Sequence, residues 1–197
     1  MNIEELKQIS TPIEINPNWL YHWIINEQML YSVYEYGILS KENLRKHQIS
    51  FVRDNDYNPG CNGTNYISVC KRTPKDSFAY DKYIRGASAF IIREDIPKIN
   101  TAPITEEFPK SKLLKSILGT RTITKQECVV NHRDEYLVKD KINFNDIIGL
   151  KLPINYDEED ILQFINFLEQ INYYLPIIDV ENKLEINQQY FRKKLKR

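Results

Sequence analysis

Four side chains that can take part in polar chemistry lie in short stretches that are otherwise apolar. His22 stands between aromatic and aliphatic neighbours, Tyr66 and Ser68 alternate with branched residues, and Glu135 begins another apolar run. A polar group in such a setting loses solvation, so it needs a hydrogen-bond partner or a ligand. Together an imidazole, a phenol, a hydroxyl and a carboxylate can bind a polar ligand and stabilise a developing positive charge. These residues are the first candidates for a site.

Taken singly, each of these residues also has an ordinary structural interpretation. A lone histidine in an apolar strand is most often a core residue with a satisfied ring. A tyrosine in a strand usually fills core or surface, and a glutamate that follows a turn usually faces solvent. His47 and His132 lie in polar surroundings and are interpreted as surface residues, whereas Cys70 and Cys128 are interpreted as small core residues. These residues therefore indicate a functional site only when they are considered together.

Hydrophobic periodicity predicts the elements that must position these residues. A strand at residues 19–23 is followed by a helix that Asn26 caps and Gly37 ends, and then by a short helix from Ser40 to Lys46. Residues 53–64 are rich in turn formers and predict a loop. We expect further strands at 65–70, 87–92, 127–130, 135–138 and 147–152, and further helices at 3–9, 76–83, 111–118, 158–174 and 181–197.

The order of these elements predicts the fold class. Strands that are interleaved irregularly with short helices are typical of an α+β protein, not of a doubly wound sheet. A chain of 197 residues is long enough for one domain with a full core and an appendage. We expect that domain at residues 1–155 and a helical C-terminal extension packed on it at residues 156–197.

Composition excludes several classes of protein. Lys+Arg and Asp+Glu both total 27, so the chain has no overall field that would hold nucleic acid or an acidic membrane. The three cysteines have no metal-type spacing, which argues against a zinc site and a disulfide framework and favours a reducing compartment. No apolar run approaches about 18 residues and the first ten residues do not resemble a signal peptide. We expect a protein without a membrane segment, and the basic end at 192–197 is interpreted as a solvated helix terminus.

The order and context of His22, Tyr66 and Glu135 resemble the His-Tyr-Glu class of ADP-ribosyltransferases. This superfamily includes diphtheria-like toxins, poly-ADP-ribose polymerases and many small bacterial or phage toxins and effectors. The resemblance covers roughly residues 19–153 and rests on short motifs. They are Leu20-Tyr21-His22-Trp23, Tyr36-Gly37-Ile38-Leu39-Ser40, Gly63-Thr64-Asn65-Tyr66-Ile67-Ser68, Asp134-Glu135-Tyr136-Leu137-Val138 and Ile147-Ile148-Gly149-Leu150.

The resemblance implies a fold and an activity. The fold would be a split antiparallel β-sandwich core with flanking helices. The activity would be that of a mono-ADP-ribosyltransferase, a glycosyltransferase that moves ADP-ribose from NAD to a macromolecular acceptor and releases nicotinamide. NAD would be a substrate, and no metal is implied.

The resemblance also implies residue roles and partners. Glu135 would be the catalytic acid beside the ribose, and His22, Tyr66 and Ser68 would bind NAD. Tyr80 or Tyr83 would supply a second stacking face for nicotinamide. The partners would be NAD, a protein or nucleic-acid acceptor and a neutralising protein, but no membrane, and the protein would act in the cytoplasm or in the cytosol of a host.

Several features leave alternatives open. Trp23 stands where relatives often carry glycine or threonine, and Glu127 begins a rival strand with its own carboxylate. A module that kept the fold without catalysis is one alternative function, and a nuclease or other toxin that uses His22 or His132 is another. The acceptor would be chosen by the loop at 118–133, whose sequence gives no unique answer.

Overall fold

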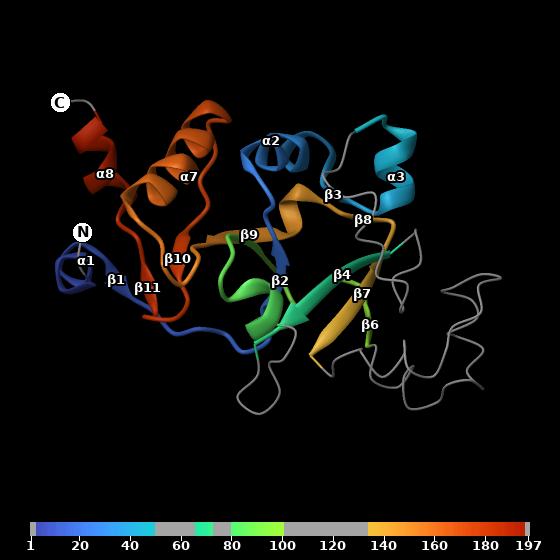
Figure 1. Ribbon diagram of the computed structural model, residues 1–197, viewed down its shortest axis with the longest axis horizontal. Helices are drawn as coiled ribbons and strands as arrows, with labels where there is room; N and C mark the ends of the chain where they lie inside the picture. Colours follow the sequence, from blue (N-terminus) through green and yellow to red (C-terminus); the bar gives the residue numbers. More distant parts are fainter. Residues whose placement is uncertain (1–2, 50–65, 73–79, 101–133, 196–197) are drawn as a thin grey trace.

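The computed structural model describes residues 3–49, 66–72, 80–100 and 134–195 (Figure 1). Within these ranges the chain is a mixed α+β structure with one large, mostly antiparallel sheet and five α-helices. The predicted α+β class is therefore confirmed. The finer expectation of a split β-sandwich core remains a proposal, and so does the division at residues 155 and 156.

The large sheet contains nine described strands, and only the β9–β10 pair is parallel. A separate two-stranded sheet pairs β3 with β8. In spatial order the large sheet is β1 (Thr11–Pro12), β11 (Leu184–Glu185), β10 (Ile177–Asp179), β9 (Ile147–Lys151), β5 (Ala89–Ile92), β2 (Leu20–Trp23), β4 (Tyr66–Lys71), β7 (Glu135–Lys139) and β6 (Ile99–Asn100); the small sheet is β3 (Ile38–Leu39) and β8 (Lys141–Ile142).

The helices gather at two places along the sheet. In Figure 1, α7 and α8 lie beside the β9–β11 end, whereas α2 and α3 lie near the small sheet. The helices are α1 (Ile3–Ile9), α2 (Glu27–Tyr36), α3 (Lys41–Lys46), α7 (Glu158–Gln170) and α8 (Gln188–Leu195), with a π-helical turn η1 (Tyr80–Ile84) and a 3-10 turn η2 (Phe144–Asp146).

The predicted helix ends around α2 and α3 are confirmed. The Asn26 side chain accepts a hydrogen bond from the backbone N–H of Met29, and Ser40 caps α3 in the same way. Gly37 ends α2 with φ of 79°, a left-handed conformation that glycine adopts without steric penalty. A Cβ at this position would also collide with the carbonyl oxygen of Ile142 on β8. The turn therefore fixes how α2 approaches the small sheet.

The sheet has a weak seam between β2 and β4. Only Leu20 and Tyr21 of β2 pair with β4, whereas β4 pairs with β7 over five residues. Beyond Tyr21, β2 continues only along β5, where His22 lies opposite Phe90. Pairing between β2 and β4 therefore stops one residue before His22.

Apolar side chains cover both faces of the sheet. The larger core cluster joins Leu20, Val69 and Phe90 of the sheet to Val33 of α2 and Phe164 of α7. The smaller cluster lies on the other face. It contains Tyr21, Cys70, Tyr80, Ile84, Ala89, Ile91, Ile178 and Val180. Residues that alternate along β4 belong to opposite faces, which is the pattern that its sequence predicted.

The C-terminal part of the chain differs from the predicted pair of helices. The helix predicted at 158–174 ends at Gln170, shortly before Asn172, which has a positive φ of 49°. The helix predicted at 181–197 begins only at Gln188, because residues 184–185 form β11. Strand β10 was not predicted. It pairs with β9 in the parallel arrangement. A strand of three residues is too short for the alternation of its side chains to be recognised in the sequence.

Some predicted elements fall on residues that the structure does not describe. The strand at 127–130, the helix at 111–118, the loop at 53–64 and the rival Glu127 lie outside the described residues. Of the helix predicted at 76–83, the described part is the π-helical turn η1.

Candidate functional site

Polar groups of three neighbouring strands are linked across the seam through Ser68, whose backbone contacts one neighbour and whose side chain contacts the other. The imidazole Nδ1 of His22 on β2 lies 2.8 Å from the backbone oxygen of Ser68 on β4. The hydroxyl of Ser68 donates to the carboxylate of Glu135 on β7. The structure thus brings together His22, Ser68 and Glu135, which are far apart in the sequence.

The register of β4 and β7 explains why Ser68 meets Glu135. Glu135 lies opposite Cys70, and Leu137 lies opposite Ser68. Residues that pair across an antiparallel ladder share a face, so Ser68 and Glu135 are diagonal neighbours on one face. Tyr66 lies two residues before Ser68 and shares that face, where it is half-buried. We name His22, Ser68, Glu135 and Tyr66 the seam cluster.

The environment of His22 favours a neutral ring. Burial lowers the pKa of His22 from its usual value near 6.5, and the contact with the Ser68 carbonyl opposes that shift in part. A carbonyl oxygen can only accept, so Nδ1 carries the proton. In the neutral ring Nε2 then remains an acceptor.

Glu135 lies at the start of β7 beside a second buried acid. Glu135 is 7 % exposed and Asp134 is 2 % exposed. The Asp134 carboxylate accepts a hydrogen bond of 3.1 Å from the backbone N–H of Tyr80, and its carbonyl accepts from the N–H of Lys71. These contacts hold the acidic pair against β4 and η1.

The two tyrosines predicted as stacking residues have different environments. Tyr80 is fully buried, and its hydroxyl donates to Glu181 at 3.2 Å. Its ring meets Tyr21 edge to face with 5.0 Å between centroids. Tyr83 is 37 % exposed and its ring meets Trp23 edge to face at 6.1 Å. Only Tyr83 has a surface that a ligand ring can reach without displacing core side chains.

A second polar group, which the sequence analysis did not find, surrounds Lys151. This lysine is fully buried on β9, and its ammonium donates to the carbonyl oxygens of Arg85, Ala87 and Leu152 at 3.2, 3.1 and 2.7 Å. Burial lowers its pKa to about 8, although the charges of Glu181 and Asp179 raise it.

Glu181 connects this lysine to its neighbours. Its carboxylate accepts from Arg72 at 3.0 Å and from the hydroxyl of Tyr80. The rings and charges of this group lie on the same face as Cys70. We name Lys151, Tyr80, Glu181 and Arg72 the lysine cluster. The sequence feature that could have indicated this cluster is the position of Lys151 inside the apolar run at 147–152.

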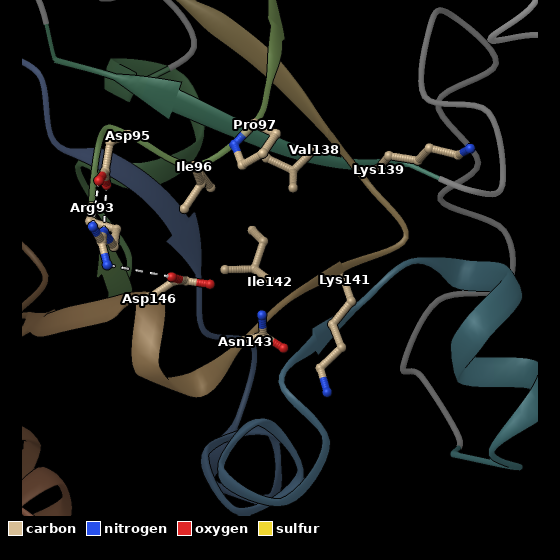
Figure 2. A pocket seen from close by; sticks show the side chains of 10 residues that line it. All are labelled: Arg93, Asp95, Ile96, Pro97, Val138, Lys139, Lys141, Ile142, Asn143 and Asp146. Carbon is tan, nitrogen blue, oxygen red and sulfur yellow. Dashed lines mark hydrogen bonds and ion pairs between the residues drawn. The ribbon is translucent and has the colours of Figure 1, made fainter.

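A surface pocket of about 370 Å³ lies elsewhere, beside the small sheet (Figure 2). Its lining comes from the segment after β5, from β7 and β8 and from η2, and none of the residues predicted to bind NAD lines it. Within the described part of the chain, no group of three His, Cys, Asp or Glu side chains is placed to hold a metal ion.

Comparisons with known proteins leave the chain without an assigned family. No model of a protein family matches it, and no curated protein matches it with significant similarity. Among the described residues, the structure contains no helix with the length and apolar character needed to cross a membrane.

Proposed function

We propose that the protein is a mono-ADP-ribosyltransferase that uses NAD and carries its catalytic carboxylate on Glu135. The observation that supports this most directly is the chain of contacts from His22 to Ser68 to Glu135. These residues carry the resemblance in the sequence motifs, and they lie on three neighbouring strands where Ser68 contacts both His22 and Glu135.

The chemistry of the proposed reaction calls for a fixed carboxylate. When the bond between nicotinamide and ribose breaks, its electron pair leaves with nicotinamide and positive charge develops on the ribose. The Glu135 carboxylate stabilises that charge, and it also accepts from a ribose hydroxyl. A nucleophile of the acceptor then bonds to the anomeric carbon and loses its proton to solvent. A carboxylate that is oriented before the reaction is more effective than one that must reorient.

The other residues of the seam cluster have supporting roles in this proposal. The Ser68 hydroxyl donates to Glu135 and orients it. The Nε2 atom of His22 offers an acceptor to a ribose hydroxyl, because Nδ1 is engaged by Ser68. Tyr66 provides one aromatic face for nicotinamide, and Tyr83 provides the other. Because Tyr80 is buried, it supports the site by packing and does not itself contact nicotinamide.

Turnover of labelled NAD tests the proposal. The purified protein is offered NAD labelled in its adenylate phosphate, with cell protein in one arm and single- and double-stranded nucleic acid in others, and free nicotinamide is measured in parallel. We expect label transfer or nicotinamide release that Glu135→Gln lowers by about 10²–10³-fold. Glu159→Gln, an exposed acid at the start of α7, is the matched control and keeps the activity.

Two results would contradict the catalytic role. One is the absence of both transfer and NAD hydrolysis by the wild-type protein under every acceptor. The other is activity that Glu135→Gln does not change. Either result rejects Glu135 as the catalytic acid.

The contact between Trp23 and Tyr83 favours a second candidate, a non-catalytic module with the same fold. In that case Trp23 fills the position that nicotinamide would take, against the ring of Tyr83. Calorimetry separates the two: the module binds NAD weakly or not at all and releases no nicotinamide. Trp23→Ala would then increase affinity for nicotinamide.

A further inference from the structure

The π-helical turn η1 packs on the face of the sheet to which Glu135 belongs. Glu135 lies opposite Cys70 in the register of β4 and β7, and Cys70 lies opposite Tyr21 in the register of β2 and β4. Residues that pair in this way share a face. Tyr21 meets the ring of Tyr80 on η1 edge to face, and Cys70 belongs to the same core cluster as both rings. The turn η1 is therefore the covering element on the Glu135 side.

Two partly exposed aromatic rings meet on this face. Trp23 follows Tyr21 by two positions on β2, so it belongs to the same face. Tyr83 on η1 meets Trp23 edge to face at 6.1 Å, and each residue is 37 % exposed. Tyr83 is the ring proposed to stack on nicotinamide. Its position depends on how η1 is held.

The turn η1 needs contacts from outside itself. It is a single turn, Tyr80–Ile84, closed by the hydrogen bond from the N–H of Arg85 to the carbonyl oxygen of Tyr80. One isolated turn is unstable in water, because it fixes several residues for few hydrogen bonds. The N–H of its first residue has no acceptor within the turn. Since Tyr80 is fully buried, this N–H needs an acceptor from another element.

Asp134 supplies that acceptor from the position next to Glu135. Its carboxylate accepts from the N–H of Tyr80 at 3.1 Å, and its backbone oxygen accepts from the N–H of Lys71 at 2.8 Å. Asp134 is 2 % exposed. The backbone contact holds it against β4, and the side-chain contact holds η1 against it. One residue thus links the turn that carries Tyr83 to the strand that carries Glu135.

We propose that Asp134 is a positioning residue of the site, which holds Tyr83 against Trp23 through the N–H of Tyr80. The inference rests on the proposed function where it assigns nicotinamide to the ring of Tyr83. Asp134 acts through η1 and does not contact the ligand. Loss of its acceptor should weaken NAD binding and leave the chemical step unchanged, because Lys71 still holds the backbone next to Glu135.

Two substitutions of Asp134 separate the hydrogen bond from the charge. Asp134→Asn keeps an acceptor oxygen for the N–H of Tyr80, whereas Asp134→Ala does not, and neither carries the charge. A difference between the two variants therefore reports the hydrogen bond. We expect Asp134→Ala to raise KM for NAD about three- to tenfold over Asp134→Asn, as is typical when an aromatic contact is lost. Their kcat values should be equal, because ground state and transition state lose the same contact.

Fluorescence of Trp23 tests the link without any need for turnover. The substitution Trp19→Phe removes the other tryptophan of the chain, so that the emission of Trp23 reports its contact with Tyr83. In this background we expect Asp134→Ala to shift the emission to longer wavelength and to increase quenching by acrylamide, toward the values of Tyr83→Ala. Asp134→Asn should keep the emission of the background.

Glu181→Gln is the matched control. Glu181 holds the same Tyr80 at its hydroxyl, at the opposite end of the side chain. This variant should lower stability without changing KM for NAD or the emission of Trp23. Circular dichroism and urea unfolding show whether each variant is folded. If Asp134→Ala is not, Asp134→Ser takes its place, because its hydroxyl lies one bond closer to the backbone than the carboxylate oxygens.

Three outcomes would overturn the inference. They are equal KM values for Asp134→Ala and Asp134→Asn, an unchanged emission of Trp23 in Asp134→Ala, and an equal rise of KM in Glu181→Gln. The last would show that any loosening of η1 has this effect. Absence of turnover by the wild-type protein rejects the proposed function instead, and the emission then still decides whether Asp134 holds Tyr83 in place.

Discussion

The seam cluster and the lysine cluster hold similar polar groups on neighbouring strands, but they satisfy them in different ways. In the lysine cluster, the Lys151 ammonium is surrounded by three backbone carbonyls and is fully buried. In the seam cluster, the Glu135 carboxylate meets a side-chain hydroxyl that is itself only half-buried. An ammonium group held by backbone atoms can move only if the backbone moves.

This difference separates a structural cluster from a candidate reactive one. Backbone carbonyls cannot move away to admit a ligand, so the lysine cluster ties β9 to the segment between η1 and β5. A hydroxyl can rotate, and the strands on either side of the seam are paired over only two residues. The side chains of the seam cluster can therefore rearrange around a ligand, whereas those of the lysine cluster cannot.

Exchanging one carboxylate in each cluster for its amide should give opposite results. Glu135→Gln should lower the proposed NAD turnover by about 10²–10³-fold, as is typical when a preorganised electrostatic group is lost, with little change in the unfolding midpoint. Glu181→Gln should keep turnover and lower stability, because it weakens the contact with Arg72. Nicotinamide release and urea unfolding of both variants measure this. If both substitutions lowered turnover equally, the distinction between a reactive seam cluster and a structural lysine cluster would be wrong.

Removing the buried charge should have the next largest effect. Lys151→Met keeps much of the side-chain volume but leaves three carbonyl groups without this donor. We expect a loss of about 3 kcal/mol in the free energy of unfolding. Chemical denaturation at pH 7 checks it, with exposed Lys46→Met as control. A stability equal to the wild type would show that the carbonyls find water or other donors.

The lowered pKa of Lys151 should make stability depend on alkaline pH. Its pKa is about 8 in the folded chain and about 10.4 in the unfolded chain. Between these values the unfolded chain binds more protons, so the free energy of unfolding rises with pH, by about 1–2 kcal/mol from pH 8 to 9.5.

Above about pH 10 the trend should reverse. Burial raises the pKa of Tyr21, Tyr80 and Tyr156, so the unfolded chain loses those protons first. Urea unfolding from pH 7 to 11 should show a maximum near pH 10. The rise should be absent in Lys151→Met, and a flat profile for the wild type below pH 10 would mean that Lys151 has the same pKa in the folded and the unfolded chain.

Ser68→Ala should have the smallest of these effects. It removes the hydroxyl that donates to Glu135 and leaves the backbone oxygen that contacts His22. We expect about a tenfold loss of the proposed turnover with a change in stability of about 1 kcal/mol. Ser68→Thr, which retains a hydroxyl, should recover most of the turnover. Failure of threonine to do so would indicate that packing at this position matters more than the hydrogen bond.

Local chemistry made the N-terminal elements predictable. Asn26, Gly37 and Ser40 act through atoms within four residues of themselves, so the ends of α2 and α3 could be read directly from the chain. The alternation in β4 likewise showed that Tyr66 and Ser68 share a face. The C-terminal strands were missed because β10 and β11 are two or three residues long and are stabilised by pairing with distant strands.

The sequence by itself determined which residue types stand in apolar surroundings and where helices begin and end, because these depend on neighbours along the chain. Only the tertiary structure decided that the Ser68 hydroxyl reaches Glu135, that Tyr80 is buried while Tyr83 is exposed, and that Lys151 is surrounded by carbonyl groups. Those facts depend on strand register and on packing between segments far apart in the sequence. A shift of one residue in the pairing of β4 with β7 would turn Glu135 to the other face of the sheet.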